Sequence, residues 1–386
     1  MAEAQMTDTA GAPRIVHGGN LHEAARRYGV PYDAWLDLST GINPHGYPVP
    51  PVPADAWRRL PDEDDHAFAA CAARYYGAPD AAHVQPTAGS QAAIRALPAL
   101  LPRASVAIAT LTYGEYAPAF AGAGHEVTAL DTTWDTLPAG IRHVIVANPN
   151  NPTAARLDAA VLLHWHAQLA ARGGTLIVDE AFADAFGDAF ADAFGDSVAN
   201  SSADPGADAC GNASCANRSH ASLAGHVAQR GLVVLRSPGK FFGLAGARCG
   251  FVLAQPALLR ELAATLGAWT VSGPARHAVM HAFADTSWQT RMHAQLADES
   301  AKLAALLHTH GFAARGTPLF AWAADPRAEA LHHALAQRGI WTRLFRHPAS
   351  PHDVPSIRIG LPANAAEWQR LEQQFAASVE ALALNR

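Results

Sequence analysis

Five short apolar runs, separated by segments long enough for helices, constrain the fold of this 386-residue chain more than any other feature. The runs are SVAIAT at 105–110, HEVTAL at 125–130, HVIVAN at 143–148, TLIVDE at 175–180 and LVVLRS at 232–237. Apolar strands that alternate with helices are typical of a mostly parallel sheet with helices packed on both faces. The sequence therefore predicts an α/β fold with such a sheet at its centre.

The length of the chain predicts two cores, because a single core stops growing at roughly 250–300 residues. Residues 1–60 are irregular and rich in Gly, Pro and Asn, and we interpret them as an N-terminal arm that contacts substrate. Residues 61–285 carry the apolar runs and form the expected large domain. Residues 286–386 begin with a long helical stretch and continue with LFAWAA, GIWTRLF and SIRIGL, which predicts a smaller C-terminal α+β domain.

One segment, 183–222, does not follow this alternation. It is the near-repeat ADAFGDAFADAFGD followed by sequence rich in Ser, Ala and Asn. Loops longer than about 12–15 residues are uncommon in compact domains unless they are functional or disordered. We therefore expect a flexible surface insertion here, and the alternative is an element that binds a partner.

The composition excludes several classes of protein. Hydrophobic residues make up 49% of the chain and charged residues 16%, which excludes wholesale disorder. The net charge of -6 offers no basic surface for nucleic acid, so a small molecule is the expected substrate. The sequence has no apolar stretch of about 18 residues, no N-terminal secretory pattern and no CxxC pair. These features predict a cytoplasmic protein that binds neither nucleic acid nor membranes.

No metal site is expected. Cys210 and Cys215 are interpreted as loop thiols rather than as a pair of metal ligands. Three pairs of histidines lie in helical sequence without clustered carboxylates, and we interpret them as solvated residues of helix faces. The pairs are His164 and His166, His308 and His310, and His332 and His333.

The segments that follow the apolar runs are rich in polar and reactive side chains. Ligands of parallel α/β sheets bind beyond the carboxyl ends of the strands. Residues 112–116, 148–153, 179–182 and 237–240 are therefore expected to form one site, although they are far apart in the sequence.

Lys240 and Asp179 are the candidate catalytic residues. Lys240 lies among glycines after a predicted strand. A lysine that forms a Schiff base needs a pKa near neutrality, which burial and a positive neighbour such as Arg248 provide. Asp179 ends a core strand, where a carboxylate needs a cationic partner. The protonated pyridine nitrogen of a cofactor is such a partner.

Three motifs carry a resemblance to a known family. NPNNPT at 148–153, DEAF at 179–182 and SPGKFFGLAGARCGF at 237–251 resemble fold type I pyridoxal-phosphate (PLP) enzymes of the class I and II aminotransferase superfamily. The resemblance implies PLP as the cofactor, with Lys240 as the Schiff-base lysine and Asp179 at the ring nitrogen. The other implied cofactor-binding residues are Gly89, Ser90 and Gln91 of a phosphate turn, Tyr113 stacked on the ring, Asn151 at the phenolic oxygen, and Ser237 and Arg248 at the phosphate.

The N-terminal sequence resembles one branch of this superfamily in particular. HGGNLHEAARRYGVPYDAWLDLSTGINPHGYP at 17–48, and Phe182 where aminotransferases generally carry Tyr, are similar to the threonine-phosphate decarboxylases of cobalamin biosynthesis. The resemblance implies that a guanidinium grips the substrate carboxylate and that the arm contacts the substrate phosphate. The implied substrate-binding residues are His17, Gly18 and Asn20 at the phosphate, Arg358 at the carboxylate, Arg343 at one of the two anions, and Asn151.

The reaction implied by this resemblance is decarboxylation of L-threonine O-3-phosphate to (R)-1-amino-2-propanol O-2-phosphate, the linker of cobalamin. A histidinol-phosphate-type aminotransferase and a non-catalytic PLP-fold binding protein are the alternatives. The family also implies a homodimer and an association with the enzyme that attaches the linker to the corrin. Three positions depart from the relatives: Leu60 replaces a Tyr that a partner subunit offers, Gly41 replaces an Asn, and Gly239 replaces Ser or Thr.

Overall fold

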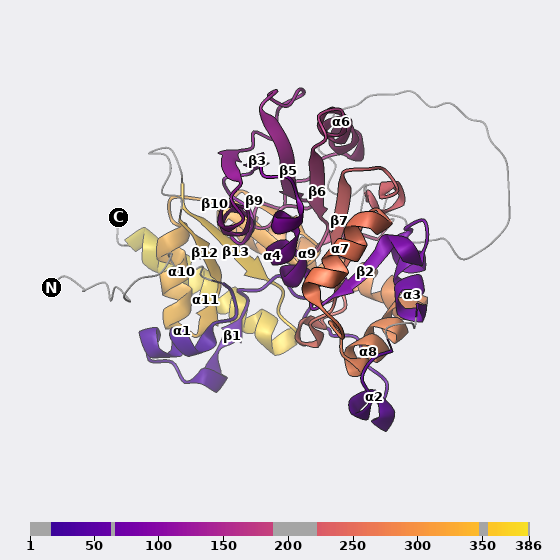
Figure 1. Cartoon of the computed structure of the whole chain (residues 1–386). Helices are drawn as coiled ribbons and strands as arrows, with labels where there is room; N and C mark the ends of the chain where they lie inside the picture. The colour runs from indigo at the N-terminus through magenta and orange to yellow at the C-terminus, as the bar shows by residue number, and fades with distance from the viewer. Residues whose placement is uncertain (1–16, 63–65, 188–221, 347–353, 385–386) are drawn as a thin grey trace, which may run out of the picture.

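The centre of the computed structural model, which describes residues 17–62, 66–187, 222–346 and 354–384, is a seven-stranded sheet (Figure 1). Its strand order is β2-β8-β7-β6-β5-β3-β4. The strands are β2 Val84–Thr87, β3 Ser105–Ile108, β4 Glu126–Ala129, β5 Ile141–Ala147, β6 Thr175–Asp179, β7 Leu232–Arg236 and β8 Gly250–Leu253. Strand β8 is antiparallel to both of its neighbours, and the other pairs in this sheet are parallel. The predicted fold class is confirmed, and the five apolar runs are β3 to β7.

Helices cover both faces of the sheet because alternate residues of a strand point to opposite sides. In β5, Val144 and Val146 belong to one hydrophobic core, and Ile145 and Ala147 belong to the other. The first core includes residues of α3 (Ala67–Tyr76), α6 (Ala159–Ala170), α8 (Gly273–Ala284) and α9 (Thr286–Thr309). The second includes residues of α4 (Ser90–Leu100), α5 (Tyr116–Gly122) and α7 (Pro256–Leu266).

Helix α9 leads into a smaller antiparallel sheet with the order β12-β13-β10-β9. Its strands are β9 Ala314–Thr317, β10 Phe320–Ala324, β12 Arg343–Phe345 and β13 Ser356–Gly360. The remaining helices of this part, α10 (Ala328–Gln337) and α11 (Ala365–Leu384), contact each other beside it (Figure 1). The apolar runs that predicted an α+β domain are therefore strands as expected.

The N-terminal segment connects the two sheets. Helix α1 (Leu21–Tyr28) contacts α10, and β1 (Leu36–Asp37) pairs in parallel with β11 (Ile340–Trp341). Further along, the Asn43 backbone N–H donates to the carbonyl of Lys240 at 3.0 Å. Helix α2 (Ala54–Arg58) then packs on α8. The pair β1-β11 is a separate two-stranded sheet, and the Gly360 N–H at the end of β13 donates to the carbonyl of Leu38 at 2.8 Å, so the segment joins the small sheet to the loop that carries Lys240.

Most of the expected insertion, residues 188–221, lies outside the described residues, so its flexibility stays a prediction, as do the domain boundaries. Its described ends belong to the core. Ala183–Ala185 form a 3-10 helix in which Asp184 is buried, and Ser222 donates from its hydroxyl to Glu180 at 2.6 Å.

Two of the histidines that we expected to be solvated are buried instead. His166 bonds the carbonyl of Arg230 at 3.0 Å, and His332 bonds the hydroxyl of Thr342 at 2.8 Å, so each has the polar partner that burial requires. Across the described ranges, no three His, Cys, Asp or Glu side chains are grouped as metal ligands. No helix in those ranges is long and apolar enough to cross a membrane.

Candidate active site

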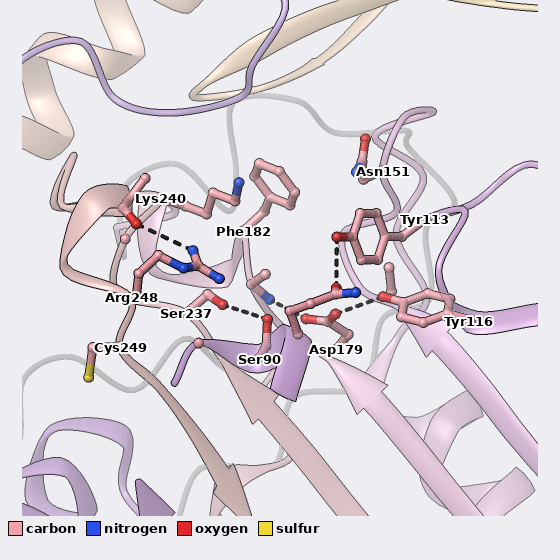
Figure 2. A pocket seen from close by; sticks show the side chains of 16 residues that line it. Ser90, Tyr113, Tyr116, Asn151, Asp179, Phe182, Ser237, Lys240, Arg248 and Cys249 are labelled. Carbon is pink, nitrogen blue, oxygen red and sulfur yellow. Dashed lines mark hydrogen bonds between the residues drawn. The ribbon is translucent and has the colours of Figure 1, made fainter. Parts of the chain in front are cut away.

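A pocket opens at the carboxyl ends of the central strands and spans about 730 Å³ with its mouth (Figure 2). Residues from all four expected strand-end segments line it, and they include Tyr113, Asn151, Asp179, Ser237 and Lys240. The parallel strands end at the same edge of the sheet, which explains how segments so distant in sequence meet.

One end of the pocket is rich in hydrogen-bond donors. Helix α4 begins at Ser90, and its N-terminal backbone N–H groups have no partners within the helix. Gly89 precedes it with φ 76°, a conformation that favours glycine. The hydroxyls of Ser237 and Ser90 lie 3.0 Å apart, and the Arg248 guanidinium lies beside Gly89. A helix N-terminus, two hydroxyls and a guanidinium together form a site suited to a phosphate dianion.

Asp179 lies at the floor of the pocket, at the end of β6. Its carboxylate accepts hydrogen bonds from the Tyr116 hydroxyl at 2.7 Å and the Ala181 backbone N–H at 3.1 Å (Figure 2). Burial raises the pKa of Asp179, although both hydrogen bonds and the charge of Lys240 favour the ionised form. A buried carboxylate held in this way is suited to a cationic partner in the pocket.

Lys240 provides the amine of the pocket. Burial and the nearby positive charges of Arg358 and Arg248 lower the pKa of Lys240 to about 8, against the opposing effect of Asp179. Its Nζ lies 5.6 Å from the centre of the Phe182 ring. A substantial fraction of this amine is therefore neutral near physiological pH, as a nucleophile requires.

Tyr113 and Asn151 border the pocket opposite Lys240. The Tyr113 hydroxyl donates to Oε1 of Gln91 at 2.9 Å, and burial raises the pKa of Tyr113 to about 12, so the phenol is neutral. Asn151 accepts a hydrogen bond from Arg358 through its side-chain oxygen. These contacts fix both side chains at the edge of the pocket.

The two arginines expected at substrate anions are neighbours in the small sheet. Arg343 of β12 is paired in register with Arg358 of β13. Arg358 donates to Asn151 and, at 2.6 Å, to the carbonyl of Ser39, while its buried Nε has no acceptor among the described residues. Burial, followed by the charge of Arg343, lowers the pKa of Arg358 to about 9. This arrangement leaves a buried cation short of negative charge.

The three expected residues of the arm have different surroundings. His17 bonds through Nε2 to Oε1 of Glu115 at 2.8 Å, and its ring lies near Tyr113 at the pocket. Gly18 packs against the backbone of Ser39, where any side chain would collide with the carbonyl oxygen. Asn20 caps α1 and bonds the carboxylate of Glu23 at 2.6 Å, so the structure does not place its side chain in the pocket.

Packing explains two of the three departures from the relatives. A Cβ at Gly41 would lie 2.9 Å from the rings of both Phe182 and Phe320, which excludes an Asn there. A Cβ at Gly239 would lie 3.0 Å from the Cα of Ala245. Leu60 is 67% exposed, and its side chain has no packing role in the described chain.

The sequence interpretation gave no individual role to three contributors to this site. Tyr116 bonds Asp179, Glu115 joins His17 to Arg95, and the Ser39 carbonyl holds Arg358. Tyr116 and Glu115 lie in the same LTYGEYA segment as Tyr113. The placement of residues 112–116 at a strand end predicted that both lie at the site without assigning either a role, whereas a backbone carbonyl leaves no signal in a sequence.

The fold and the pocket together define a class of protein. The chain belongs to the aminotransferase class I and II family, whose model matches residues 53–371. Within that family, the chain is similar to the threonine-phosphate decarboxylase of Pseudomonas aeruginosa, with 44% identity over 93% of this chain and 96% of the relative. It is also similar to a threonine-phosphate decarboxylase of Sinorhizobium, with 39% identity over 94% of this chain and 98% of the relative.

Solved structures show the same fold at lower identity. The histidinol-phosphate aminotransferase of Sinorhizobium meliloti in complex with pyridoxal-5'-phosphate aligns with a TM-score of 0.71 at 17% identity, covering 97% of this chain and 100% of that one. The L-threonine-O-3-phosphate decarboxylase of Porphyromonas gingivalis aligns with a TM-score of 0.67 at 16% identity, covering 89% of this chain and 99% of that one. At such identities the likeness establishes the fold alone.

Proposed function

We propose that this enzyme decarboxylates L-threonine O-3-phosphate with the help of PLP and forms (R)-1-amino-2-propanol O-2-phosphate. The observation that carries the proposal is the similarity to two threonine-phosphate decarboxylases over nearly their whole length. Histidinol-phosphate aminotransferases are more distant, for example 28% identical over 85% of this chain for that of Shewanella amazonensis.

The residues of the pocket fit PLP. The N-terminus of α4 with Ser90, Ser237 and Arg248 would hold the cofactor phosphate, Asp179 would face the ring nitrogen, and Lys240 would hold the cofactor covalently. When bound, PLP supplies an electron-accepting ring for the pair of electrons released by bond cleavage. The carboxylate of Asp179 would favour a proton on the ring nitrogen, because an ion pair there would offset the cost of burying the carboxylate.

Arg358 is the residue we assign to the substrate carboxylate. Its guanidinium is buried, lacks an acceptor at Nε and is short of negative charge. A substrate carboxylate would supply both the acceptor and the charge in a bidentate pair. By fixing the carboxylate, Arg358 orients the bond between Cα and the carboxyl carbon for cleavage. Carbon dioxide leaves, and a proton replaces it at Cα. We assign that proton to Lys240, whose pKa of about 8 allows it to hold and release one near neutrality.

The substrate phosphate has its own set of candidates. Arg343 supplies positive charge, His17 supplies a ring nitrogen, and Gly18, which follows His17, supplies a backbone without a side chain. Glu115 accepts from Nε2 of His17, so Nδ1 can donate to the phosphate when the imidazole carries both protons. We retain Asn20 as a positioning residue of the arm, because its amide caps α1 directly after this glycine-rich turn.

Product analysis tests the proposal. The purified enzyme with L-threonine O-3-phosphate should release carbon dioxide without 2-oxoglutarate, and Lys240→Ala should release none. Turnover that depends on 2-oxoglutarate would assign the enzyme to the aminotransferases. A protein that takes up PLP but does not convert L-threonine O-3-phosphate, with or without 2-oxoglutarate, would be the non-catalytic alternative.

A homodimer is part of the same proposal. Trp57 of α2 and Leu60, which follows that helix, are 70% and 67% exposed, and Trp269, shortly before α8, is 53% exposed. The two helices are in contact, since a Cβ at Gly273 would lie 2.3 Å from the carbonyl of Ala56. Sedimentation of the wild type and of Leu60→Asp tests this surface, and an unchanged dimer in the variant would place the interface elsewhere. Association with the corrin-linker enzyme and the cytoplasmic location stay predictions.

A further inference from the structure

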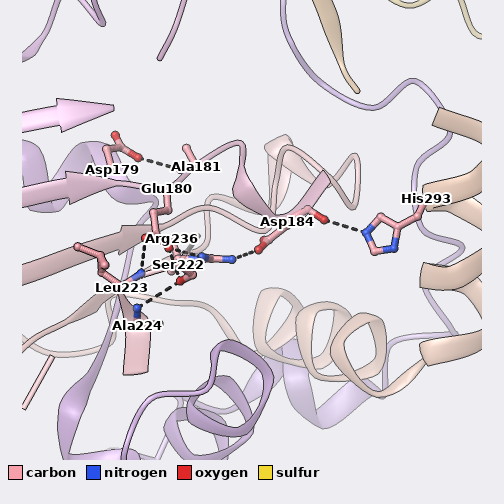
Figure 3. Close-up of polar contacts among 9 residues, drawn as sticks. All are labelled: Asp179, Glu180, Ala181, Asp184, Ser222, Leu223, Ala224, Arg236 and His293. Atoms are coloured by element: carbon pink, nitrogen blue, oxygen red, sulfur yellow. Dashed lines mark hydrogen bonds and ion pairs between the residues drawn. The ribbon is translucent and has the colours of Figure 1, made fainter. Parts of the chain in front are cut away.

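A buried ionic network lies next to Asp179 at the end of β6 (Figure 3). The Arg236 guanidinium pairs with the carboxylates of both Glu180 and Asp184, and all three side chains are buried. Its NH1 also lies 3.3 Å from the hydroxyl of Ser222. The ring of Tyr76 covers the guanidinium at 4.4 Å. The network buries two carboxylates on one guanidinium, and Oδ2 of Asp184 and Nε of Arg236 have no hydrogen-bond partner among the described residues.

Two members of this network are chain neighbours of pocket residues. Glu180 directly follows Asp179 at the end of β6, and Arg236 directly precedes Ser237 at the end of β7. The two strands are adjacent and parallel, with Asp179 in register with Leu235. A bond between Glu180 and Arg236 therefore ties together the two strand ends from which Asp179 and Ser237 face the pocket.

The network also reaches the loop of Lys240. His293 of α9 bonds the carbonyl of Asp184 through Nε2 at 2.9 Å (Figure 3). The same ring stacks on Phe241, the residue after Lys240, with centroids 4.4 Å apart. Asp179, Ser237 and Lys240 thus each have a chain neighbour held in one buried layer.

We propose that Glu180 and Arg236 are a positioning pair, which sets the distance between the carboxylate of Asp179 and the phosphate site at Ser237. The inference rests on the proposed PLP-dependent function. Neither side chain lines the pocket, so the pair acts through its neighbours rather than on the cofactor.

The hydrogen bonds distinguish Glu180 from Asp184. Glu180 accepts on both oxygens: Oε1 from the Leu223 backbone N–H at 2.8 Å, and Oε2 from Ser222 and Arg236. An amide in its place would direct its NH₂ group at a donor in either orientation. Asp184 accepts from Arg236 through Oδ1, while Oδ2 has no partner among the described residues. An amide there can keep the oxygen on Arg236 and leave the NH₂ group on the free side.

Glu180→Gln and Asp184→Asn are therefore a matched pair, since each removes one negative charge from the same network. We expect Glu180→Gln to weaken PLP binding at least about 10-fold, to lower kcat about 100-fold and to shift the pH titration of the lysine-bound cofactor band. We expect Asp184→Asn to stay within about two-fold of the wild type in all three measurements. Urea unfolding of both variants without PLP separates positioning from loss of stability.

A folded Glu180→Gln enzyme with wild-type PLP affinity and an unshifted band would overturn the inference, as would equal losses in both variants. If Glu180→Gln does not fold, Arg236→Lys replaces it, because an ammonium keeps the charge but loses the fork that joins both strand ends. Wild-type PLP affinity in that variant would also overturn the inference. A wild type that takes up no PLP would instead contradict the proposed function.

Discussion

The cofactor side and the substrate side of the pocket are built in different ways. Asp179 and Ser237 lie at the ends of neighbouring strands of one sheet, and Lys240 follows in the same loop as Ser237. Arg358 and His17 come from the small sheet and the arm. Arg358 is held by Asn151 and the Ser39 carbonyl, and His17 is held by Glu115. The cofactor side therefore depends on sheet register, whereas the substrate side depends on how the arm and the small sheet pack.

This difference predicts two kinds of variant. Changes on the cofactor side should alter the cofactor spectrum together with turnover, because the same strand ends support both. Changes on the substrate side should alter kcat/KM and leave the spectrum intact. The experiments below compare the two sides, beginning with the largest expected effect.

Lys240→Ala should cause the largest loss. The buried amine is the only nucleophile assigned to the cofactor, so kcat should fall by about 10³-fold or more. The visible band of lysine-bound PLP should disappear. Absorption spectra and carbon dioxide release measure both effects. A variant that retained the band would show that another amine holds the cofactor.

Two deletions test whether the cofactor side needs the ends of the 183–222 segment. Removal of 183–222 takes away Asp184 and Ser222, which both bond the Glu180–Arg236 pair, and should lower the free energy of unfolding by about 3 kcal/mol. Replacement of 188–221 by a short Gly-Ser linker keeps both residues and should preserve stability and PLP binding. Urea titrations compare the two, and equal stability would show that the network is dispensable.

Arg358→Lys is the counterpart on the substrate side. A lysine cannot bond Asn151, Ser39 and a carboxylate in one plane as the guanidinium does. We expect kcat/KM to fall about 100-fold while the cofactor band persists. Steady-state kinetics and spectra of the same preparation are the measurement. Loss of the band would show that the two sides are not separable.

Glu115→Gln should have a smaller effect. Its bond to His17 joins a buried carboxylate to a ring that is 49% exposed, and ion pairs of this kind contribute about 1 kcal/mol or less. We expect KM for the phosphorylated substrate to rise about two- to five-fold with kcat unchanged. A KM as high as that of His17→Ala would show that the contribution of the arm to substrate binding depends entirely on Glu115.

The two sides also differ in how well the sequence predicts them. The cofactor side follows from contiguous motifs, because a strand end and the residues after it occupy one stretch of sequence. The substrate side depends on packing between segments: the Ser39 carbonyl that holds Arg358 leaves no sequence signal, and Asn20 caps a helix instead of facing the pocket. The same limit applies to Asp184. The repetitive sequence around it predicted a surface loop, but its carboxylate is buried and pairs with Arg236.

The smallest expected effect links the two sides through charge. The pKa of Lys240 is lowered to about 8, and after burial the positive charge of Arg358 is the largest cause. PLP reacts with the neutral amine, so uptake by the cofactor-free enzyme should slow as pH falls below about 8 and level off above it. Arg358→Met removes the charge and should move this midpoint upward by a fraction of a pH unit, whereas Arg358→Lys retains the charge and should move it less. Stopped-flow absorbance across pH measures the midpoints. Equal midpoints in the wild type and Arg358→Met would show that Arg358 does not contribute to the pKa of Lys240, and that the substrate side influences the reaction only through binding.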